Sequence, residues 1–350
     1  MTVLASDPRP ATALPVLPRT DPIARLPILI LYPHSRCNCR CLMCDIWRDT
    51  RRAELTAADV ERWLPGWREL GVERVVLSGG EALLHSHLWE LCGLLREAGM
   101  GITLLTTGLL LARDATALAR VCDDVVVSLD GPREVHDRIR NLPGAYDKLA
   151  AGVAALRAAG PGVAVSGRCT VQRANHRSLR ETVRAAHEIG LDRISFLAAD
   201  VSSEAFNRPG GWEQERAAAI ALRPEDLPAL AAELAALGDE HVADFAGGFI
   251  AESPEKLGRR LLRHFSALQG EGEFAPVECN APWVSAVVET DGTVRPCFFQ
   301  PPLGSLRHGE SLGTILNSEA AIAWRRGLDT SRDAICRRCV CSLALREGAA

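Results

Sequence analysis

Cysteines are the side chains whose number and spacing point most directly to chemistry in this chain of 350 residues. Twelve are present, and most fall in two groups near opposite ends of the sequence. The first group reads Cys37-Asn38-Cys39-Arg40-Cys41-Leu42-Met43-Cys44, and the second comprises Cys279, Cys297, Cys336, Cys339 and Cys341. Disulfides are disfavoured in a reducing compartment, so clustered cysteines in a chain without a secretory signal indicate metal or redox chemistry.

Three cysteines of the first group, Cys37, Cys41 and Cys44, have the spacing C-x3-C-x2-C. Three thiolates on one tight loop can ligate three irons of a [4Fe–4S] cluster and leave the fourth iron open. A zinc site with four ligands is the alternative. Candidates for its fourth ligand are Cys39, His34 and Asp45.

The second group contains two pairs of cysteines. Cys279 and Cys297 flank a predicted hairpin turn at Asp291-Gly292, whereas Cys336 and Cys339 are separated by two residues. Four thiolates in two pairs would close a metal site completely. From spacing alone, a structural zinc ribbon and an iron–sulfur cluster remain equal alternatives.

The elements that must position these cysteines alternate between short apolar runs and helical patterns. The predicted strands are Pro27–Tyr32, Arg74–Leu77, Ile102–Leu105, Asp124–Leu129, Gly162–Val171 and Arg193–Leu197. Helical patterns follow them near residues 57–70, 86–98, 114–121, 146–159 and 178–189. Six β-then-α units predict a parallel sheet with right-handed crossovers. Since a closed barrel needs eight strands, the α/β fold class predicted is a partial (β/α)6 TIM-like barrel.

After about residue 200 the βα pattern weakens. Helical patterns near 224–237 and 254–268 precede a predicted β-hairpin, Trp283–Glu289 with Thr293–Phe298. We therefore predict an extended proline-rich arm over residues 1–25 and the barrel over 26–245. A small iron–sulfur domain of one β-hairpin plus helix is predicted over 246–350.

Small or polar residues follow three of the predicted strands. These segments are Ser78-Gly79-Gly80-Glu81, Thr106-Thr107-Gly108 and Ser128-Leu129-Asp130-Gly131. Reactive residues of βα barrels gather at the carboxyl ends of the strands, so all three segments belong on the same rim as the first cysteine group. The placement of all three segments on one rim indicates a functional site more specifically than any one motif does.

Across residues 25–200 the chain resembles the radical S-adenosylmethionine (radical SAM) enzymes. The C-x3-C-x2-C loop after the first strand and Gly-Gly-Glu after the second carry the resemblance. It implies that Cys37, Cys41 and Cys44 ligate a [4Fe–4S] cluster whose open iron is chelated by SAM. Cys39 is not expected to be a ligand, because one turn cannot aim four thiolates and still admit SAM.

The resemblance also implies the residues that contact SAM. Gly79, Gly80 and Glu81 would receive its methionyl amino group. The ribose would contact Ser128 and Asp130, and Met43 would pack near the adenine. The chain departs from the family pattern at Ala82, where proline is common, and at Thr107, where asparagine is common.

The second cysteine group resembles the twitch domain, the shortened form of the SPASM domain. The arrangement is similar to that of the butirosin-pathway radical SAM dehydrogenase, which holds one auxiliary cluster. This implies a second [4Fe–4S] cluster on four cysteines, with Cys341 as a substitute for the last. The implied ligands are Cys279, Cys297, Cys336 and Cys339.

The resemblance implies a reaction class. A flavodoxin- or ferredoxin-type donor would reduce the first cluster, SAM would be cleaved to a 5′-deoxyadenosyl radical, and the substrate would lose hydrogen. We expect a two-electron oxidation of a small polar metabolite, such as a sugar, cyclitol or amino-acid derivative, with the auxiliary cluster as electron acceptor. A peptide-modifying maturase is the alternative. A non-catalytic zinc-binding scaffold is the hypothesis from another class, and it leaves Gly79-Gly80-Glu81 without a purpose.

Composition narrows the partners. The net charge of −4 gives no basic field for nucleic acid or an anionic membrane, and no apolar stretch reaches the length of a membrane span. We therefore expect a cytoplasmic protein. Weaker candidates for contact with SAM or substrate are Arg168, Gln172 and the loop from Asp200 to Trp212. Cys92 and Cys122 are expected to be buried by packing, and Cys169 is only a weak candidate for the site.

Overall fold

One curved sheet forms the centre of the computed structural model, which describes residues 15–348. Its nine strands lie in the order β6-β5-β4-β3-β2-β1-β7-β8-β9. Neighbours from β6 to β7 pair in parallel, whereas β8 pairs antiparallel with both β7 and β9. The strands are β1 (Ile28–His34), β2 (Arg74–Gly79), β3 (Gly101–Thr106), β4 (Asp124–Ser128), β5 (Ala164–Val171), β6 (Arg193–Ala198), β7 (Ser285–Val288), β8 (Thr293–Arg295) and β9 (Gly304–Ser305).

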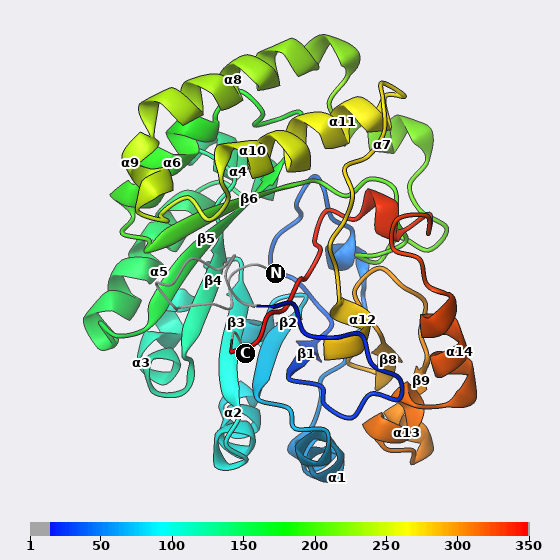
Figure 1. Cartoon of the computed structure of the whole chain (residues 1–350). Helices are drawn as coiled ribbons and strands as arrows, with labels where there is room; N and C mark the ends of the chain where they lie inside the picture. Colours follow the sequence, from blue (N-terminus) through cyan, green and yellow to red (C-terminus); the bar gives the residue numbers. More distant parts are fainter. Residues whose placement is uncertain (1–14, 349–350) are drawn as a thin grey trace.

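Helices cover the outer face of strands β1 to β6 (Figure 1). They are α1 (Ala57–Glu69), α2 (Leu88–Glu97), α3 (Leu111–Val121), α4 (Arg133–Arg140), α5 (Ala145–Ala159) and α6 (Leu179–Glu188). Leu29, Val75 and Leu104 point from successive strands into the apolar core beneath these helices. The predicted partial barrel of six βα units is confirmed, and only α4 lacks a counterpart among the predicted helices.

The inner face of the barrel carries the alternate residues of each strand, because successive side chains of a strand point to opposite faces. Ile28, Ile30 and Val76 form a second apolar cluster on this face. Val287 and Leu343 of the C-terminal region belong to the same cluster. The C-terminal region therefore closes the inner side of the barrel near β1 and β2.

The C-terminal hairpin continues the barrel sheet. β7 pairs in parallel with β1, and Gly292, with φ of 84°, turns the chain into β8. Both strands are shorter than predicted. Helix α12 (Ala281–Val284) takes the start of the first one, because Pro282 favours the first turn of a helix. The second ends at Arg295, since Pro296 cannot donate to a strand ladder.

Two short helices, α13 (Leu312–Leu316) and α14 (Glu319–Gly327), supply the predicted helical part of this region.

The segment after β6 covers the other edge of the sheet. It contains α7 (Gln214–Ile220), α8 (Leu227–Glu240), α9 (Val242–Ala246), α10 (Pro254–Leu257), a π-helix (Gly258–Leu262) and α11 (Arg263–Leu268). Ile194 of β6 exchanges backbone hydrogen bonds with Phe249 (2.7 Å) and Ala251 (2.9 Å). Residues 249–251 thus still pack on the barrel edge, and the domain boundary near 245 stays a prediction.

The described part of the N-terminal arm runs beside the end of the chain. The backbone amide of Leu17 donates to the carbonyl of Leu345 (2.8 Å), and Asp21 pairs with the buried Arg325. Residues 1–14 of the predicted arm lie outside the described residues. Between residues 15 and 348, no helix is long and apolar enough to cross a membrane.

Candidate active site

The first cysteine group lies on the loop that follows β1. Helix α4 holds this loop, because the amides of Arg40 and Leu42 donate to the carbonyls of Arg140 (3.3 Å) and Ile139 (3.0 Å). The Trp47 indole donates to the Cys44 carbonyl (2.8 Å) at the far end of the loop. Helix α4 thus holds the middle of the loop, and the Trp47 hydrogen bond closes the turn at its far end.

The thiols of this loop lie in different electrostatic surroundings. Burial raises the pKa of the Cys37 and Cys44 thiols, that of Cys44 to about 12. A hydrogen bond from Cys39 and the nearby Arg140 guanidinium lower the pKa of the Cys41 thiol. Metal ligation removes these protons, so a bound iron cluster would relieve the cost of burying thiolates. The Cys39 thiol is only 2% exposed and donates a hydrogen bond to the Cys41 sulfur. Cys39 therefore supports Cys41.

Arg140 is a functional residue that the sequence reasoning missed. It is the last residue of α4, and its Nη1 donates to Cys41 Sγ (3.5 Å) while Nη2 pairs with Asp130 Oδ2 (2.6 Å). Hydrogen bonds and charge at cluster sulfurs tune iron–sulfur sites. The sequence signal was the strand-end segment Ser128-Leu129-Asp130-Gly131, which marks Asp130 but not the side chain that pairs with it.

The Gly79-Gly80-Glu81 turn fits tightly against the cysteine loop. Gly79 has φ of 95°, and a Cβ on Gly80 would lie 2.0 Å from the carbonyl oxygen of Arg36. The Glu81 carboxylate is fully buried and accepts from Thr106 Oγ1 (2.8 Å) and from Thr107 N (2.8 Å) and Oγ1 (2.6 Å). Burial raises the pKa of Glu81. This carboxylate therefore ties the ends of β2 and β3 together, while the glycines let the two backbones approach.

The three other predicted SAM contacts lie on the same rim. Ser128 ends β4 and is partly exposed on the inner face. Asp130 is fully buried, and besides Arg140 it accepts from the Thr170 amide (2.9 Å). Met43 packs against the apolar cluster that includes Ala199 and Val201. The structure thus places these residues on one rim, but Arg140 and the Thr170 amide already bond to the Asp130 carboxylate.

The second cysteine group lines one cavity. Its walls include all five cysteines of the group together with Ile30, Phe298 and Gln300. Gln300 Nε2 donates to Cys336 Sγ (3.3 Å) and to Asp333 Oδ1 (3.1 Å). Burial raises the pKa of the Cys339 thiol, and the nearby thiols of Cys341, Cys279 and Cys297 contribute in the same direction. Both Cys339 and Cys341 therefore face the cavity, and the choice between them as a ligand stays open.

Family comparisons match residues 31–186 to the radical SAM superfamily and residues 279–340 to SPASM, an iron–sulfur cluster-binding domain. The chain carries a radical SAM domain followed by a SPASM domain. The radical SAM domain binds SAM and a [4Fe–4S] cluster, and the SPASM domain indicates auxiliary iron–sulfur clusters. These matches confirm the resemblance and the two kinds of cofactor predicted from the sequence.

Several curated proteins are similar to this radical SAM chain. AdoMet-dependent heme synthase from Methanosarcina barkeri is 29% identical over 159 residues, or 44% of this chain and 45% of that protein. PqqA peptide cyclase from Ruegeria pomeroyi is 28% identical over 293 residues, or 80% of this chain and 71% of that protein. The chain spans about half the length of the heme-pathway relatives.

Solved structures share the fold. SuiB from Streptococcus suis, bound to S-adenosylmethionine, superposes with a TM-score of 0.63 at 16% identity. The superposition covers 93% of this chain and 77% of the SuiB chain. The protein anSMEcpe, with bound AdoMet and a Cp18Cys peptide, superposes with a TM-score of 0.63 at 20% identity. The superposition covers 91% of this chain and 92% of the anSMEcpe chain. At these identities the likeness shows the fold alone.

The thiol donors of the two cysteine sets fit the iron–sulfur clusters that the two domain matches indicate. Within residues 15–348, no group of three or more His, Cys, Asp or Glu side chains lies close enough to hold one metal ion. The ligands of a [4Fe–4S] cluster bind different irons and lie farther apart than the ligands of one zinc ion. The cavity lined by five cysteines and apolar side chains offers the thiolates that such a cluster needs.

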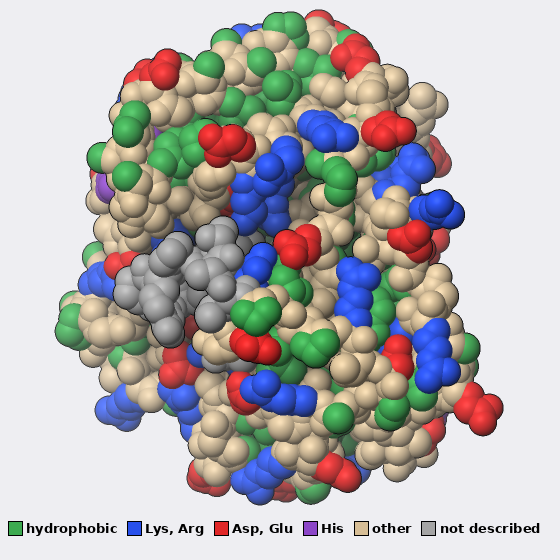
Figure 2. Space-filling model, viewed as in Figure 1, with side chains coloured by type: hydrophobic (Ala, Val, Ile, Leu, Met, Phe, Trp, Pro, Cys, Tyr) green, Lys and Arg blue, Asp and Glu red, His purple; other side chains and the backbone are tan. Residues whose placement is uncertain are grey.

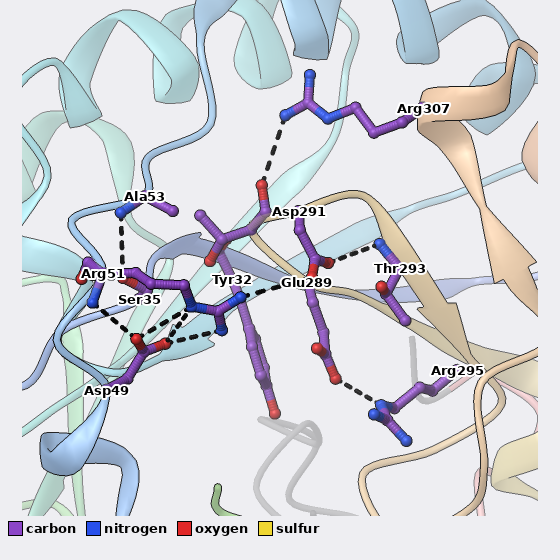
Figure 3. Close-up of polar contacts among 11 residues, drawn as sticks. Tyr32, Ser35, Asp49, Arg51, Ala53, Glu289, Asp291, Thr293, Arg295 and Arg307 are labelled. Atoms are coloured by element: carbon purple, nitrogen blue, oxygen red, sulfur yellow. Dashed lines mark hydrogen bonds and ion pairs between the residues drawn. The ribbon is translucent and has the colours of Figure 1, made fainter.

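Tyr32 on β1 lies between the two cysteine groups. Burial and the Glu289 carboxylate raise the pKa of its phenol, and Cys44 and Cys297, one from each group, contribute in the same direction. Figure 3 shows Tyr32 beside the Glu289–Arg295 ion pair of the hairpin (2.5 Å). Thr290 Oγ1 donates to the Tyr32 carbonyl (3.2 Å), which fixes the hairpin to β1. The space around Tyr32 is therefore common to both cysteine sites.

The predicted rim loop from Asp200 to Trp212 does contact the site. Asn207 Nδ2 donates to the Asp45 carbonyl (3.1 Å), and the Trp212 indole donates to the Asp45 carboxylate (2.5 Å). A buried ion pair between Arg208 and Asp200 fixes the loop internally. The loop therefore lies against the end of the cysteine loop.

Three single cysteines lie away from the site. Cys92, Cys122 and Cys169 are 0%, 5% and 0% exposed in the outer apolar core, so Cys169 does not face the barrel interior.

Proposed function

We propose that this radical SAM protein oxidatively modifies a peptide. The similarity to PqqA peptide cyclase carries the proposal, because it extends over 80% of the chain and is longer than the matches to the heme-pathway relatives. SuiB has been solved with its precursor peptide SuiA and anSMEcpe with a Cp18Cys peptide, so proteins of this fold accommodate peptide chains. The expected small polar metabolite has no comparable support, and a peptide replaces it as the proposed substrate.

The proposed roles of the site residues follow from their positions. Cys37, Cys41 and Cys44 would ligate the cluster, and Gly79-Gly80-Glu81 would shape the pocket for the methionyl group. Ser128 would contact the ribose and Met43 the adenine. When bound, the cluster and SAM supply a 5′-deoxyadenosyl radical that takes a hydrogen atom from a substrate carbon.

The second half of the reaction is assigned to the SPASM domain. Cys279, Cys297, Cys336 and either Cys339 or Cys341 would hold an auxiliary cluster without an open iron. Such a site suits electron transfer, so the proposed net change is a two-electron oxidation in which the peptide loses two hydrogens. The proposed reductant is a flavodoxin- or ferredoxin-type protein, which fits a reducing compartment such as the cytoplasm.

The test is a peptide-modification assay with the anaerobically reconstituted full chain. Short peptides encoded beside its gene are incubated with SAM and a chemical reductant, and products are measured by mass spectrometry. We expect a peptide that lacks two hydrogens, formed in step with 5′-deoxyadenosine. Cys41→Ala should abolish both products. Oxidation of a small polar metabolite, with every peptide unchanged, would contradict the proposal.

A further inference from the structure

The exposed side of the cysteine loop consists almost entirely of arginines. Six residues between positions 36 and 52 are exposed, and apart from Thr50 they are Arg36, Arg40, Arg48, Arg51 and Arg52. We call these five arginines the basic surface. Neither of the two carboxylates in the same stretch is exposed, and the whole chain carries a net charge of −4. Positive charge is therefore concentrated on the loop that holds the predicted cluster ligands.

The chain neutralises only part of this charge. Arg48 pairs with Asp45 (2.9 Å), and Arg51 pairs with Asp49 (2.9 Å) and lies 4.0 Å from Asp291 of the hairpin (Figure 3). Within residues 15–348, no ion pair forms at the side chains of the other three, Arg36, Arg40 and Arg52. Over the molecular face in Figure 2, by comparison, Lys and Arg side chains are interspersed with Asp and Glu. The basic surface therefore has a positive local potential that attracts an acidic partner.

Trp47 connects the basic surface to a predicted cluster ligand. The guanidinium groups of Arg48 and Arg40 lie over its ring, 5.0 Å and 5.8 Å from the ring centre. On its other side, the Trp47 indole donates to the carbonyl of Cys44 (2.8 Å). A protein bound over Arg40 and Arg48 would therefore be separated from Cys44 by one aromatic side chain.

The composition of the exposed surface favours a transient complex held by charge. Among residues 15–348, the large hydrophobic side chain that is exposed is Val242 of α9, which does not belong to the cysteine loop. Electron-transfer proteins form small, short-lived interfaces, and complementary charges raise the rate at which the partners meet. Tryptophan and arginine are also the side chains that most often dominate binding energy at interfaces. An acidic electron-transfer protein fits these properties.

We propose that the basic surface, together with Trp47, is the docking site of an acidic electron-transfer protein that reduces the first cluster. The donor loses one electron and the cluster gains it, so no further reactant is needed. A donor docked here would lie against the loop that carries Cys37, Cys41 and Cys44. The inference rests on the proposed function for the use of a protein reductant, and it names the surface that such a reductant contacts.

The test measures how tightly an oxidised flavodoxin of net negative charge binds the anaerobically reconstituted full chain, by titration calorimetry. Arg40→Glu and, as a second variant, Arg52→Glu should each weaken binding about threefold, and the double variant about tenfold. Raising the salt concentration from about 0.05 M to about 0.3 M should weaken binding to the parent and narrow these differences, because salt screens exposed charges. Arg120→Glu is the matched control and should leave binding unchanged, since Arg120 is exposed in the last turn of α3 and lies outside the basic surface.

A second readout separates docking from damage to the cluster. The rate of 5′-deoxyadenosine formation is measured with SAM and without peptide, so the result does not depend on the proposed substrate. Reduced flavodoxin, at concentrations where the rate is proportional to the donor, is compared with reduced methyl viologen, a small cation. Each variant should slow the flavodoxin reaction about threefold and leave the methyl viologen reaction within about twofold of the parent.

Three outcomes would overturn the docking site. In the first, Arg40→Glu and Arg52→Glu bind flavodoxin as the Arg120→Glu control does. In the second, both reductants lose rate equally, because the change would then act on the cluster and not on the protein contact. In the third, the variants bind acetyl-tetraglutamate amide more weakly but flavodoxin equally well, which would assign the arginines to an acidic peptide.

Discussion

The buried pair of Arg140 and Asp130 gives the sharpest test of how the cysteine loop is held. The two side chains are 7% and 0% exposed, and Arg140 also donates to Cys41 Sγ. Arg140→Met keeps most of the side-chain volume but leaves the Asp130 carboxylate buried without its cation. The Thr170 amide would remain as a donor to Asp130.

Arg140→Met is expected to lower the free energy of unfolding by more than most single substitutions do. Removing one partner of a buried ion pair costs about 3–5 kcal/mol, because the other charge stays buried. Asp130→Asn in the Arg140→Met background removes that stranded charge, so the double variant should recover part of the loss. Arg138→Met is the matched control, since Arg138 is exposed on the same helix, and it should change stability by less than about 0.5 kcal/mol.

Urea unfolding of the cluster-free chain measures these free energies directly. In the reconstituted protein, Arg140→Met should also make the reduction potential of the first cluster more negative, since a positive charge beside a cluster ligand favours the reduced state. Arg140→Lys keeps the charge and should restore most of that potential. If Arg140→Met loses less than about 1 kcal/mol and the potential does not move, the assigned role of the pair is wrong.

Three further predictions follow from the same site. Gly80→Ala places a Cβ 2.0 Å from the Arg36 carbonyl and should cost about 1–3 kcal/mol in urea unfolding, whereas Gly93→Ala, with nothing within 4 Å, should gain up to about 1 kcal/mol. Burial lowers the pKa of His136 to about 3 and that of His264 to about 4, so the folded state binds fewer protons than the unfolded one. Stability is therefore fully present above about pH 6.5 and falls toward pH 4, by about 2 kcal/mol per histidine at pH 5, and His136→Gln should flatten the curve. Cys297→Ala should lower the iron content to about four per chain while SAM cleavage continues, and unchanged iron would exclude Cys297 as a ligand.

Local patterns were sufficient to predict much of the fold and of the first site. The strands of the barrel are short apolar runs, and Cys37, Cys41 and Cys44 lie within one loop. The position of β7 beside β1 was not predictable, because no residue of Ser285–Val288 indicates which sheet edge it joins. Helix α12 took the first two residues of the predicted strand Trp283–Glu289, because the propensity of Pro282 for a first helical turn prevailed over the apolar run there.

Contacts between side chains far apart in sequence could not be predicted from local sequence patterns either. Arg140 and Cys41 are separated by 99 positions, and their contact depends on how α4 packs on the loop. The family resemblance implied that Asp130 contacts the ribose, and this stays a prediction. The structure also pairs Asp130 with Arg140, which a strand-end motif cannot reveal.

Arg140 and Arg168 both point inward. Their side-chain partners distinguish a cation with a structural role from one that can bind a ligand. For Arg140 the chain supplies both a carboxylate and a thiol, so its charge is balanced before any ligand arrives. For Arg168, residues 15–348 supply neither, although the Glu252 carboxylate lies within electrostatic range. A site that had only to be stable would pair Arg168 with that carboxylate. Leaving the pair open keeps the cation available to a bound anion on the rim that carries Ser128.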